Sequence, residues 1–326
     1  MQRVGFGGHI DRGATAVRSR GWSLRRREQI AGILFALPAI LGFVLWAAGP
    51  MIASLVISLT DWSLLAPPHW LGLANYVGGV TPSHPFPGIT NDPLFWTSLR
   101  TTLYYTGGTL PLTMVVSFII ALLLSQPIRM VALFRTIFYL PAVLPAVGTA
   151  IAWLWLFNPQ FGLLNTLLSA VGLPTSRWIF SEGAAMPSLI LVNAWASGAL
   201  MLTFLAAIKG VPRERLEAAA IDGAGAVRRV WHITVPTVSP VILFNLVTAL
   251  IATFAGGFTQ SLIITNGGPN NATLLFALYL YREAFQNGLF GYAAAMSWVM
   301  FILLLVVTLA ILGLARRYVH YEDAGR

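Results

Sequence analysis

The sequence predicts an all-α membrane protein that crosses the bilayer with six helices. Composition gives the first indication, because 57% of the 326 residues are hydrophobic and only 10% are charged. The mean hydropathy is +0.75, whereas an ordinary soluble domain carries about 25% charged residues. The second indication is a series of long apolar stretches, since about 20 apolar residues suffice for a helix to cross a bilayer. The chain is therefore expected to form a helical bundle in lipid, joined by short loops.

Six apolar stretches along the chain have this length. They run over residues 30–59, 101–124, 137–157, 188–208, 241–264 and 289–314. All six lack Asp, Glu, Lys and Arg, as expected of spans in which a central charge costs about 2.5–3.5 kcal/mol. Several contain residues that interrupt helices, namely Pro38, Pro111, Pro141, Pro145 and the pair Gly256-Gly257. Neighbouring helices can satisfy the backbone groups freed at such positions, so we expect kinked and closely packed helices.

The positions of Lys and Arg predict the orientation of the spans, because cytoplasmic flanks carry more of them than external flanks do. Apart from Arg100, Arg177 and Arg282, they fall in the amino-terminal arm, in two alternate loops and in the carboxyl-terminal tail. Both termini are therefore expected in the cytoplasm. A secretory or twin-arginine signal is disfavoured, because the first apolar stretch is too long for one. The chain thus divides into a basic cytoplasmic arm (1–29), a membrane domain (30–315) and a cytoplasmic tail (316–326).

The loop between the fourth and fifth predicted spans, residues 211–236, is termed the polar loop. From Pro212 to Asp222 its residues are strong helix formers, with Pro212 suited to the first turn and Gly223 to the end. We therefore expect a short helix outside the bilayer. Its small alanines would let another protein approach closely, and Glu217 could accept a charge-assisted hydrogen bond from that partner. An amphipathic connector helix lying on the membrane surface would show the same pattern.

Several classes of site are not expected in this chain. Its single lysine, Lys209, is not part of a G-x-x-x-x-G-K-[ST] phosphate-binding loop, so the chain should not hydrolyse ATP by that route. The spans hold no charged residue that could relay protons or ions. The five histidines lie in loops or tails and there is no cysteine, so neither a haem or other metal site nor a thiol catalyst is expected. The net charge of +9 reflects arginines at the ends of spans rather than a surface for nucleic acid.

One run of residues in the polar loop resembles a known motif. Glu217-Ala218-Ala219-x-x-Asp222-Gly223-Ala224, followed by Ile233-x-x-Pro236, is similar to the E-A-A loop of permease subunits of binding-protein-dependent ABC importers. More closely, the chain resembles the MalF-like subunit of carbohydrate importers, over nearly everything after the basic arm. The other segments that carry the resemblance are Leu37-Pro38, 58–62 (SLTDW), 71–76 (LGLANY), 134–141 (FRTIFYLP), 157–165 (FNPQFGLLN), 267–273 (GGPNNAT) and 291–295 (GYAAA).

The resemblance implies how such a chain would work. In that family the E-A-A loop forms a coupling helix seated in a groove of a cytoplasmic ATPase subunit, and closure of two such subunits on ATP shifts the paired permeases from inward-open to outward-open. Ile233 and Pro236 would direct the chain back into the fifth helix. The coupling element would comprise Glu217, Ala218, Ala219, Asp222 and Gly223. The implied partners are a second homologous permease, two ATPase subunits that bind ATP and Mg²⁺, an extracytoplasmic solute-binding protein and the cell membrane of a prokaryote.

The fifth predicted span departs from the family in the region that lines the translocation path there. Relatives often carry an acidic residue after the phenylalanine, whereas Phe258 is followed here by Thr259 and Gln260, so no particular substrate can be carried over. On a continuous helix one face would hold Thr253, Gly256, Gly257 and Gln260. Tight packing of helices through small residues is the competing interpretation. The further path candidates are Thr259 and, one turn apart in the fourth span, Asn193 and Ser197.

The sequence therefore predicts the membrane-spanning subunit of an ATP-driven importer, which would form half of the path for a carbohydrate or a related solute. The outer loops are too short for a binding domain, so solute capture would fall to a separate extracytoplasmic protein, for which Asp61, Trp62 and the 265–273 loop are candidate contacts. Two other functions stay open. A secondary carrier would need ion-relay groups or internal repeats, and a membrane scaffold would use the polar loop only to recruit a soluble protein.

Overall fold

The computed structural model describes residues 24–78 and 88–315. In these residues the regular structure is helical, apart from an isolated antiparallel bridge between Thr60 and Trp70. This confirms the all-α prediction. The predicted tail and most of the predicted arm lie outside the described residues. The chain divides after Ser54 into two compact units, Met1–Ser54 and Leu55–Arg326.

A nearly continuous apolar helix makes up the described part of the first unit and runs three residues beyond it. α1 spans Leu24–Phe43, a π-helical turn η1 covers Val44–Ala48, and α2 spans Gly49–Ile57. The π turn comes directly before Pro50, which lacks an N–H and whose ring would clash with the carbonyl four residues earlier, so ordinary α-helical bonding cannot continue there. The side chains of Phe35 and Trp46 are 91% and 84% exposed, as expected of a helix that faces lipid.

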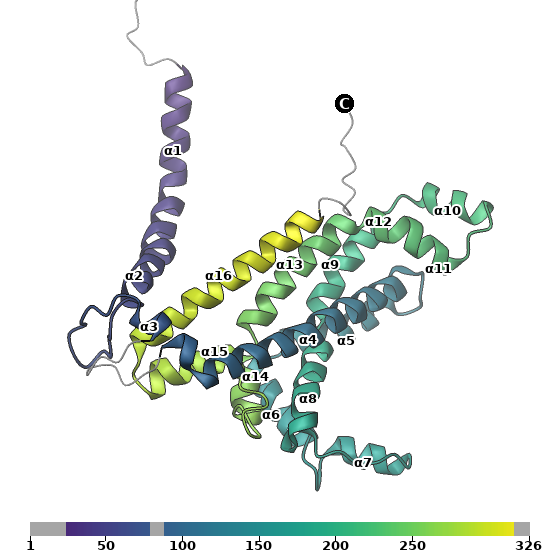
Figure 1. Ribbon diagram of the computed structural model, residues 1–326. Coiled ribbons are helices and arrows are strands. Elements are labelled where there is room, and N and C mark those ends of the chain that lie inside the picture. Colours follow the sequence, from purple (N-terminus) through teal and green to yellow (C-terminus); the bar gives the residue numbers. More distant parts are fainter. Residues whose placement is uncertain (1–23, 79–87, 316–326) are drawn as a thin grey trace, which may run out of the picture. The chain divides into compact units, whose positions relative to one another are not determined.

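The second unit is organised around α4, Pro93–Ser125, a helix of 33 residues. Asp92 caps its start, because its carboxylate accepts a hydrogen bond from the Leu94 N–H at 2.8 Å, and Pro93 occupies the first turn. The helix thus begins before the predicted span and includes Arg100. The helices that pack against α4 are α8 (Glu182–Trp195), α9 (Gly198–Lys209), α13 (Ser239–Ala255) and α15 (Phe276–Tyr281) (Figure 1).

One face of α4 carries small buried polar side chains that recur every three or four residues: Ser98, Thr102, Thr106, Thr109, Thr113 and Ser117. Small residues let neighbouring helices approach closely, and their hydroxyl groups can bond to the neighbours. The Thr102 hydroxyl accepts a hydrogen bond from the Phe276 N–H at 2.8 Å, and the Ser117 hydroxyl donates to the Ser197 carbonyl at 2.9 Å. This face therefore ties α4 to two distant parts of the chain.

Two of the predicted spans are sharply bent. The third consists of α5, Val131–Val143, and α6, Ala146–Leu156, whose axes differ by 99°. The bend lies at Leu144, which is extended because the following Pro145 excludes the helical conformation. The fourth span consists of α8 and α9, which differ by 47°. At this bend a Cβ added to Gly198 would lie 2.3 Å from the Phe138 carbonyl oxygen, so glycine allows α9 to touch the backbone of α5.

Four described helices are long and apolar enough to cross a membrane, and each bent pair adds one span if it crosses once, which gives the six predicted spans. The last of them is α16, Phe290–Ala315. The shorter helices are α3 (Ala74–Val77), η2 (Ile89–Asn91), α7 (Leu163–Ala170), η3 (Trp178–Phe180), α10 (Arg213–Ile221), α11 (Ala226–Arg229), η4 (Val230–Thr234), α12 (Val235–Thr237), α14 (Phe258–Gln260), η5 (Ser261–Thr265) and η6 (Arg282–Gln286).

Candidate functional site

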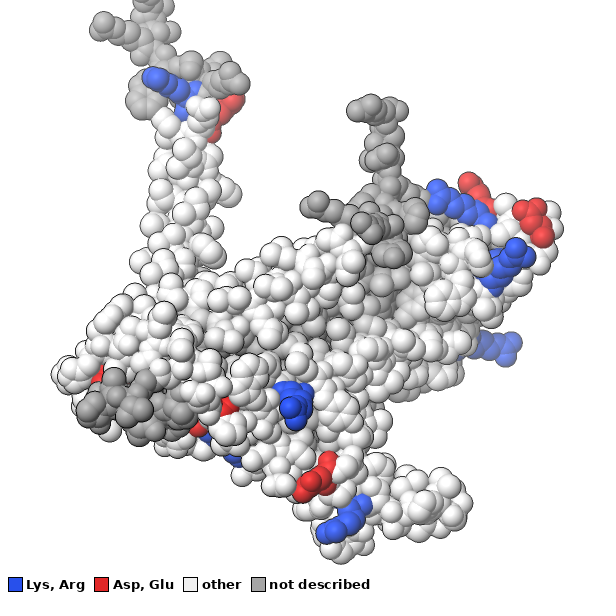
Figure 2. Space-filling model, viewed as in Figure 1, with Lys and Arg blue, Asp and Glu red and all other residues white. Residues whose placement is uncertain are grey.

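The polar loop begins with a short exposed helix, as the sequence predicts. α10 follows Pro212, begins at Arg213 and ends at Ile221. None of its residues is buried, although Leu216 and Ala219 are half-covered. Figure 2 shows Lys, Arg, Asp and Glu side chains gathered over α10 and α11, whereas the visible faces of the long helices in this unit carry few charges.

The end of α10 has a defined hydrogen-bond pattern. The Ala224 N–H donates to the Ala219 carbonyl at 2.8 Å, and the Gly223 N–H donates to the Ala220 carbonyl at 3.1 Å. Together with a φ of +80° at Gly223, these two bonds form a Schellman motif, which ends a helix with one left-handed residue. Glycine adopts that conformation without steric cost. The glycine of the E-A-A run is therefore the residue that ends the helix.

The polar loop returns to the membrane through helical turns. The chain is helical from Ala226 to Ala255 except at Val238, through α11, the π-helical η4, α12 and α13. Ile233 lies in η4 and Pro236 in α12, where the missing N–H of proline is tolerated in the first turn. Both residues thus lie on the path back into the fifth span. Large apolar side chains stay exposed in the loop: Ile221 (87%), Val227 (71%) and Trp231 (66%).

Two of the seven candidate path residues meet at a tyrosine that is not among them. The Tyr105 hydroxyl accepts a hydrogen bond from Asn193 Nδ2 at 2.7 Å and donates one to Gln260 Oε1 at 3.1 Å. Tyr105 is fully buried on α4, while Asn193 lies on α8 and Gln260 on α14. We term these three residues the polar triad. A buried tyrosine hydroxyl usually has a hydrogen-bond partner. A tyrosine inside an apolar span was therefore the one feature of the sequence that could have indicated this site.

The fifth span is not the continuous helix that the sequence analysis assumed. α13 ends at Ala255, Gly256 is extended, and Gly257 has a φ of +76° before α14 begins. The prediction that four residues share one helical face is therefore wrong, because the two glycines break the helix between Thr253 and Gln260. Gly257 also has no room for a side chain, since an added Cβ would lie 3.0 Å from Tyr105 Cε1 and 2.7 Å from Leu275 Cδ1.

The break changes which candidate residues come together. Gly257 and Gln260 lie against Tyr105, and Asn193 joins them through its hydrogen bond. Thr253 is buried on α13, Thr259 is half-buried on α14, and Ser197 is buried at the bend between α8 and α9. Non-helical backbone inside a membrane is tolerated where it is enclosed by protein or lines a hydrated cavity. The break at Gly256-Gly257 and the polar triad therefore form one polar region within the spans.

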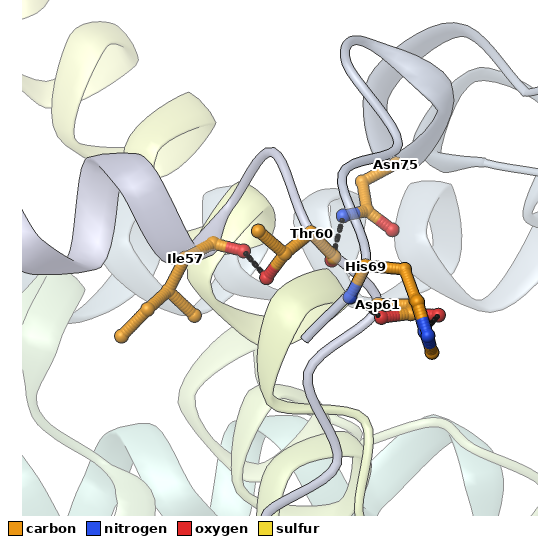
Figure 3. Close-up of polar contacts among 5 residues, drawn as sticks. All are labelled: Ile57, Thr60, Asp61, His69 and Asn75. Carbon is orange, nitrogen blue, oxygen red and sulfur yellow. Dashed lines mark hydrogen bonds and ion pairs between the residues drawn. The ribbon is translucent and has the colours of Figure 1, made fainter. Parts of the chain in front are cut away.

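Three of the segments that carry the family resemblance meet at one end of the second unit. Asn75 Nδ2 donates to the Ser58 carbonyl at 2.8 Å. It also donates to the Thr60 carbonyl at 2.9 Å (Figure 3). The Gly291 N–H donates to the Trp62 carbonyl at 3.1 Å. A Cβ added to Gly291 would lie 2.0 Å from the Thr60 carbonyl oxygen, so only glycine fits there. The Ser58 and Tyr76 hydroxyl groups also bond to each other at 2.7 Å, so the 58–62, 71–76 and 291–295 segments are joined by contacts to the main chain of 58–62 and by this side-chain pair.

Asp61, a candidate contact for a binding protein, is engaged within the same region. Its carboxylate accepts hydrogen bonds from the His69 N–H at 2.6 Å and pairs with the His69 ring at 3.1 Å (Figure 3). Partial burial alone would raise the pKa of Asp61, but the hydrogen bonds and the charge interaction with His69 outweigh it and lower the pKa. Asp61 therefore shapes this loop.

The 265–273 loop is closed by its own contacts. The Thr273 hydroxyl donates to the Gly268 carbonyl at 2.7 Å, the Ser261 hydroxyl donates to the Thr273 carbonyl at 2.6 Å, and Arg282 donates to Asn266 at 2.9 and 3.0 Å. The loop is therefore a compact structural element. Within the 267–273 segment, Gly267, Asn270 and Asn271 have φ values of +73°, +48° and +59°, a conformation that glycine and asparagine adopt readily.

A buried acidic cluster lies beside this loop. The hydroxyl groups of Tyr279 and Tyr292 both donate to Asp92 Oδ2, at 2.5 and 2.6 Å. Glu283 is only 4% exposed and accepts a hydrogen bond from Asn287 at 3.0 Å. Burial, together with the neighbouring charge of Asp92, raises the pKa of Glu283, although the bond from Asn287 acts in the opposite direction. The cluster joins the start of α4 to the segments on either side of η6.

The chain is similar to known transport proteins over most of its length. A family model described as "Binding-protein-dependent transport system inner membrane component" matches residues 100–320. The probable ABC transporter permease protein YesP of Bacillus subtilis is 38% identical over 302 residues, which cover 91% of this chain and 94% of that protein. The arabinooligosaccharides transport system permease protein AraP of the same organism is 30% identical over 306 residues, 92% of this chain and 94% of that protein.

A further relative and a solved structure agree with these matches. The sn-glycerol-3-phosphate transport system permease protein UgpA of Yersinia enterocolitica is 33% identical over 284 residues, 86% of this chain and 91% of that protein. A chain in the crystal structure of a bacterial alginate ABC transporter, in complex with an alginate pentasaccharide-bound periplasmic protein, matches with a TM-score of 0.75 and 23% identity. The match covers 91% of this chain and 98% of that chain. At this identity it supports the fold.

Proposed function

Because the chain belongs to the family of inner membrane components of binding-protein-dependent transport systems, we propose that it forms half of the translocation path of an ATP-driven carbohydrate importer. A second homologous permease would supply the other half. Relatives named for arabinooligosaccharide and sn-glycerol-3-phosphate transport support a carbohydrate or a related polyol as the solute. The importer would lie in the cell membrane of a prokaryote, with both termini of this chain in the cytoplasm, as the distribution of Lys and Arg indicates.

In this proposal α10 is the coupling helix. The observation that carries the proposal is the exposed helix between two membrane spans, ended by a Schellman motif at the glycine of the E-A-A run. The exposed apolar side chain of Ile221 would be covered by a cytoplasmic ATPase subunit. Two such subunits would bind and hydrolyse ATP with Mg²⁺, and this chain would take no catalytic part. The residues proposed to couple are Glu217, Ala218, Ala219, Asp222, Gly223, Ile233 and Pro236.

The solute path is proposed to pass the polar triad. Amide and hydroxyl groups match the donors and acceptors of a neutral sugar without a charged clamp, and a rearrangement of the triad could present Asn193 and Gln260 to the solute. Gly256 and Gly257 would keep the backbone unwound there, with Thr253, Thr259 and Ser197 as neighbouring contributors. No Lys or Arg belongs to this set, so of the two solutes for which the relatives are named it suits an arabinooligosaccharide better than sn-glycerol-3-phosphate. A separate extracytoplasmic protein would deliver the solute to the end where the 58–62, 71–76 and 291–295 segments meet.

Purification of the membrane complex tests the coupling role. Glu217→Lys places a positive charge on the proposed contact, and Gly223→Pro removes the left-handed residue that ends α10. Each variant is expected to lose the ATPase subunits or to uncouple ATP hydrolysis from solute uptake. Glu214→Lys is the matched control, because Glu214 is also exposed on α10 but lies outside the E-A-A run.

The outcome separates the proposed importer from its two competitors. A nucleotide-binding subunit that co-purifies with the wild type and with Glu214→Lys, and is lost or uncoupled in the other two variants, supports the importer. Uptake that continues without ATP hydrolysis would indicate a secondary carrier. An intact membrane complex without an ATPase, and without uptake, would indicate a scaffold.

A further inference from the structure

A basic groove lies at the membrane ends of α4 and α9, beside the polar loop. The groove has a volume of about 850 Å³ and is lined by residues of α4, α5, α9, α10, α11 and η4 and the turns beside them. Its charged lining residues are the cations Arg135, Lys209, Arg213 and Arg229 and the single carboxylate Glu217. Among the residues that the structure describes, none of these four cations forms an ion pair. The groove therefore holds an excess of positive charge.

In two of these cations a buried N–H group has no hydrogen-bond acceptor, although folded proteins normally provide one. Arg135 and Arg229 are half-buried, and the Nε atom of each is fully buried without a hydrogen-bond partner in the described part of the chain. An unpaired N–H of a buried charged group is costly. Guanidinium groups pair well with phosphate and carboxylate oxygens, because their planar donors match two oxygens at once. Because both guanidinium groups line the groove without an ion pair in the described residues, they favour an anionic ligand there.

An apolar groove continues from the basic one. It has a volume of about 610 Å³, and every residue that lines it is apolar. Leu122, Ala226 and Val230 line both grooves, so the two are contiguous. Trp231 lines the apolar groove and is 66% exposed, which is typical of tryptophan at the boundary between lipid tails and headgroups. A ligand that fills both grooves must have an anionic end and a long apolar end.

We propose that the two grooves together bind an anionic phospholipid. The phosphate group would lie between Arg135 and Arg229, with Lys209 and Arg213 at the rim, and one acyl chain would follow the apolar groove along α4. A free phosphate ion would leave the apolar groove empty, and a zwitterionic lipid would place its own ammonium group beside the four cations. The binding site is built on Arg135 and Arg229, which have no part in the proposed coupling set, and it borders that set because Glu217 also lines the basic groove.

Lipid selectivity of the purified membrane complex tests this proposal. After delipidation in a neutral detergent, native mass spectrometry measures the binding of phosphatidylglycerol, phosphatidylcholine and inorganic phosphate. We expect phosphatidylglycerol to bind at least ~5-fold more tightly than phosphatidylcholine, since one cation near an anionic headgroup contributes about fivefold. Replacing Arg135→Gln and Arg229→Gln together should weaken phosphatidylglycerol binding by about 25-fold. The matched control is Arg129→Gln with Arg228→Gln, two exposed arginines that do not line the groove, and it should change binding by less than about twofold.

Quenching of Trp231 gives a second readout that keeps all four cations. Phosphatidylglycerol with brominated acyl chains should quench the fluorescence of the complex more than brominated phosphatidylcholine does, and Trp231→Phe should remove that difference. Equal binding of the two lipids, or an equal loss in the control variant, would overturn the proposal, because the charge effect would then be a general property of the surface. Inorganic phosphate that binds as tightly as phosphatidylglycerol would overturn the assignment to a lipid.

Discussion

The left-handed backbone angle of Gly223 at the end of α10 can be tested for its contribution to coupling. Gly223 has a φ of +80°, and a Cβ added to it would meet no atom within 4 Å. Gly223→Ala therefore introduces no clash, and its effect comes only from placing a side chain in the left-handed conformation. That costs roughly 1–2 kcal/mol, which corresponds to about a 5- to 30-fold change in an equilibrium constant. In Gly223→Ala, the equilibrium between the closed and the open last turn of α10 should shift toward the open state by this factor.

Hydrogen exchange measures that opening directly. The Ala224 N–H, which bonds across the motif to Ala219, should exchange about 5- to 30-fold faster in Gly223→Ala, with a parallel loss of coupled ATPase activity in the complete complex. Gly223→Asn should lie between the wild type and Gly223→Ala, because asparagine tolerates the left-handed conformation better than alanine does. Gly225→Ala is the matched control: its φ is −63° and it also has open space around it, so exchange and coupling should be preserved.

Two results would refute the reasoning. Unchanged exchange in Gly223→Ala would mean that the motif does not hold the helix end in the assembled complex. Equal acceleration in Gly225→Ala would mean that the loop responds to any loss of glycine, and that the left-handed residue has no special role.

Three further predictions concern the membrane part. Tyr105→Phe removes two hydrogen bonds, each contributing about 0.5–1.5 kcal/mol, and should lower the melting temperature of the complex; Tyr104→Phe, at a side chain that is 56% exposed, should not. Glu283→Gln should raise the melting temperature at pH 7.5 and not at pH 4. Burial and a nearby carboxylate raise the pKa of Glu283, so the protonated side chain contributes its full stability to the fold below about pH 4.3. That contribution is lost as pH rises through the raised pKa, and glutamine, which stays neutral, avoids the loss. Equal effects at both pH values would contradict this. Gly291→Ala should destabilise by about 1–3 kcal/mol or more through a clash with a main-chain oxygen, whereas Gly313→Ala in the same helix meets no atom within 4 Å and should melt like the wild type.

Local features of the structure could be predicted from the sequence where a residue type strongly favours one position, such as the start or the end of a helix. The helix from 212 to 222 is confirmed as α10, because strong helix formers lie between a proline that suits the first turn and a glycine that suits the end. The six spans are predicted by the same kind of local signal, since a charge inside lipid is so costly that its absence marks a membrane segment. Both signals need only neighbouring residues.

Features that depend on distant contacts could not be predicted in this way. Pro145 predicts a kink in the third span. The 99° angle, however, depends on the helices that pack around the kink, such as α9, which touches α5 at Gly198. The triad of Asn193, Tyr105 and Gln260 joins residues that are 88 and 155 positions apart, which no periodicity reveals. The shared face proposed for the fifth span was wrong because a helical spacing was applied across two glycines that end the helix.

The contacts of Asn75 and Gly291 bear on how this permease could be recombined with its relatives. Both residues recognise peptide groups of the 58–62 segment, by hydrogen bonds from Asn75 and by close approach at Gly291. A peptide group is the same whatever side chain it carries, so these contacts depend on the path of the segment, whereas Ser58 and Asp61 add side-chain contacts to Tyr76 and His69. Chimeras that exchange residues 58–62 should therefore assemble when the loop length, Ser58 and Asp61 are kept, whereas a donor segment replacing 71–76 or 291–295 must bring its own asparagine or glycine.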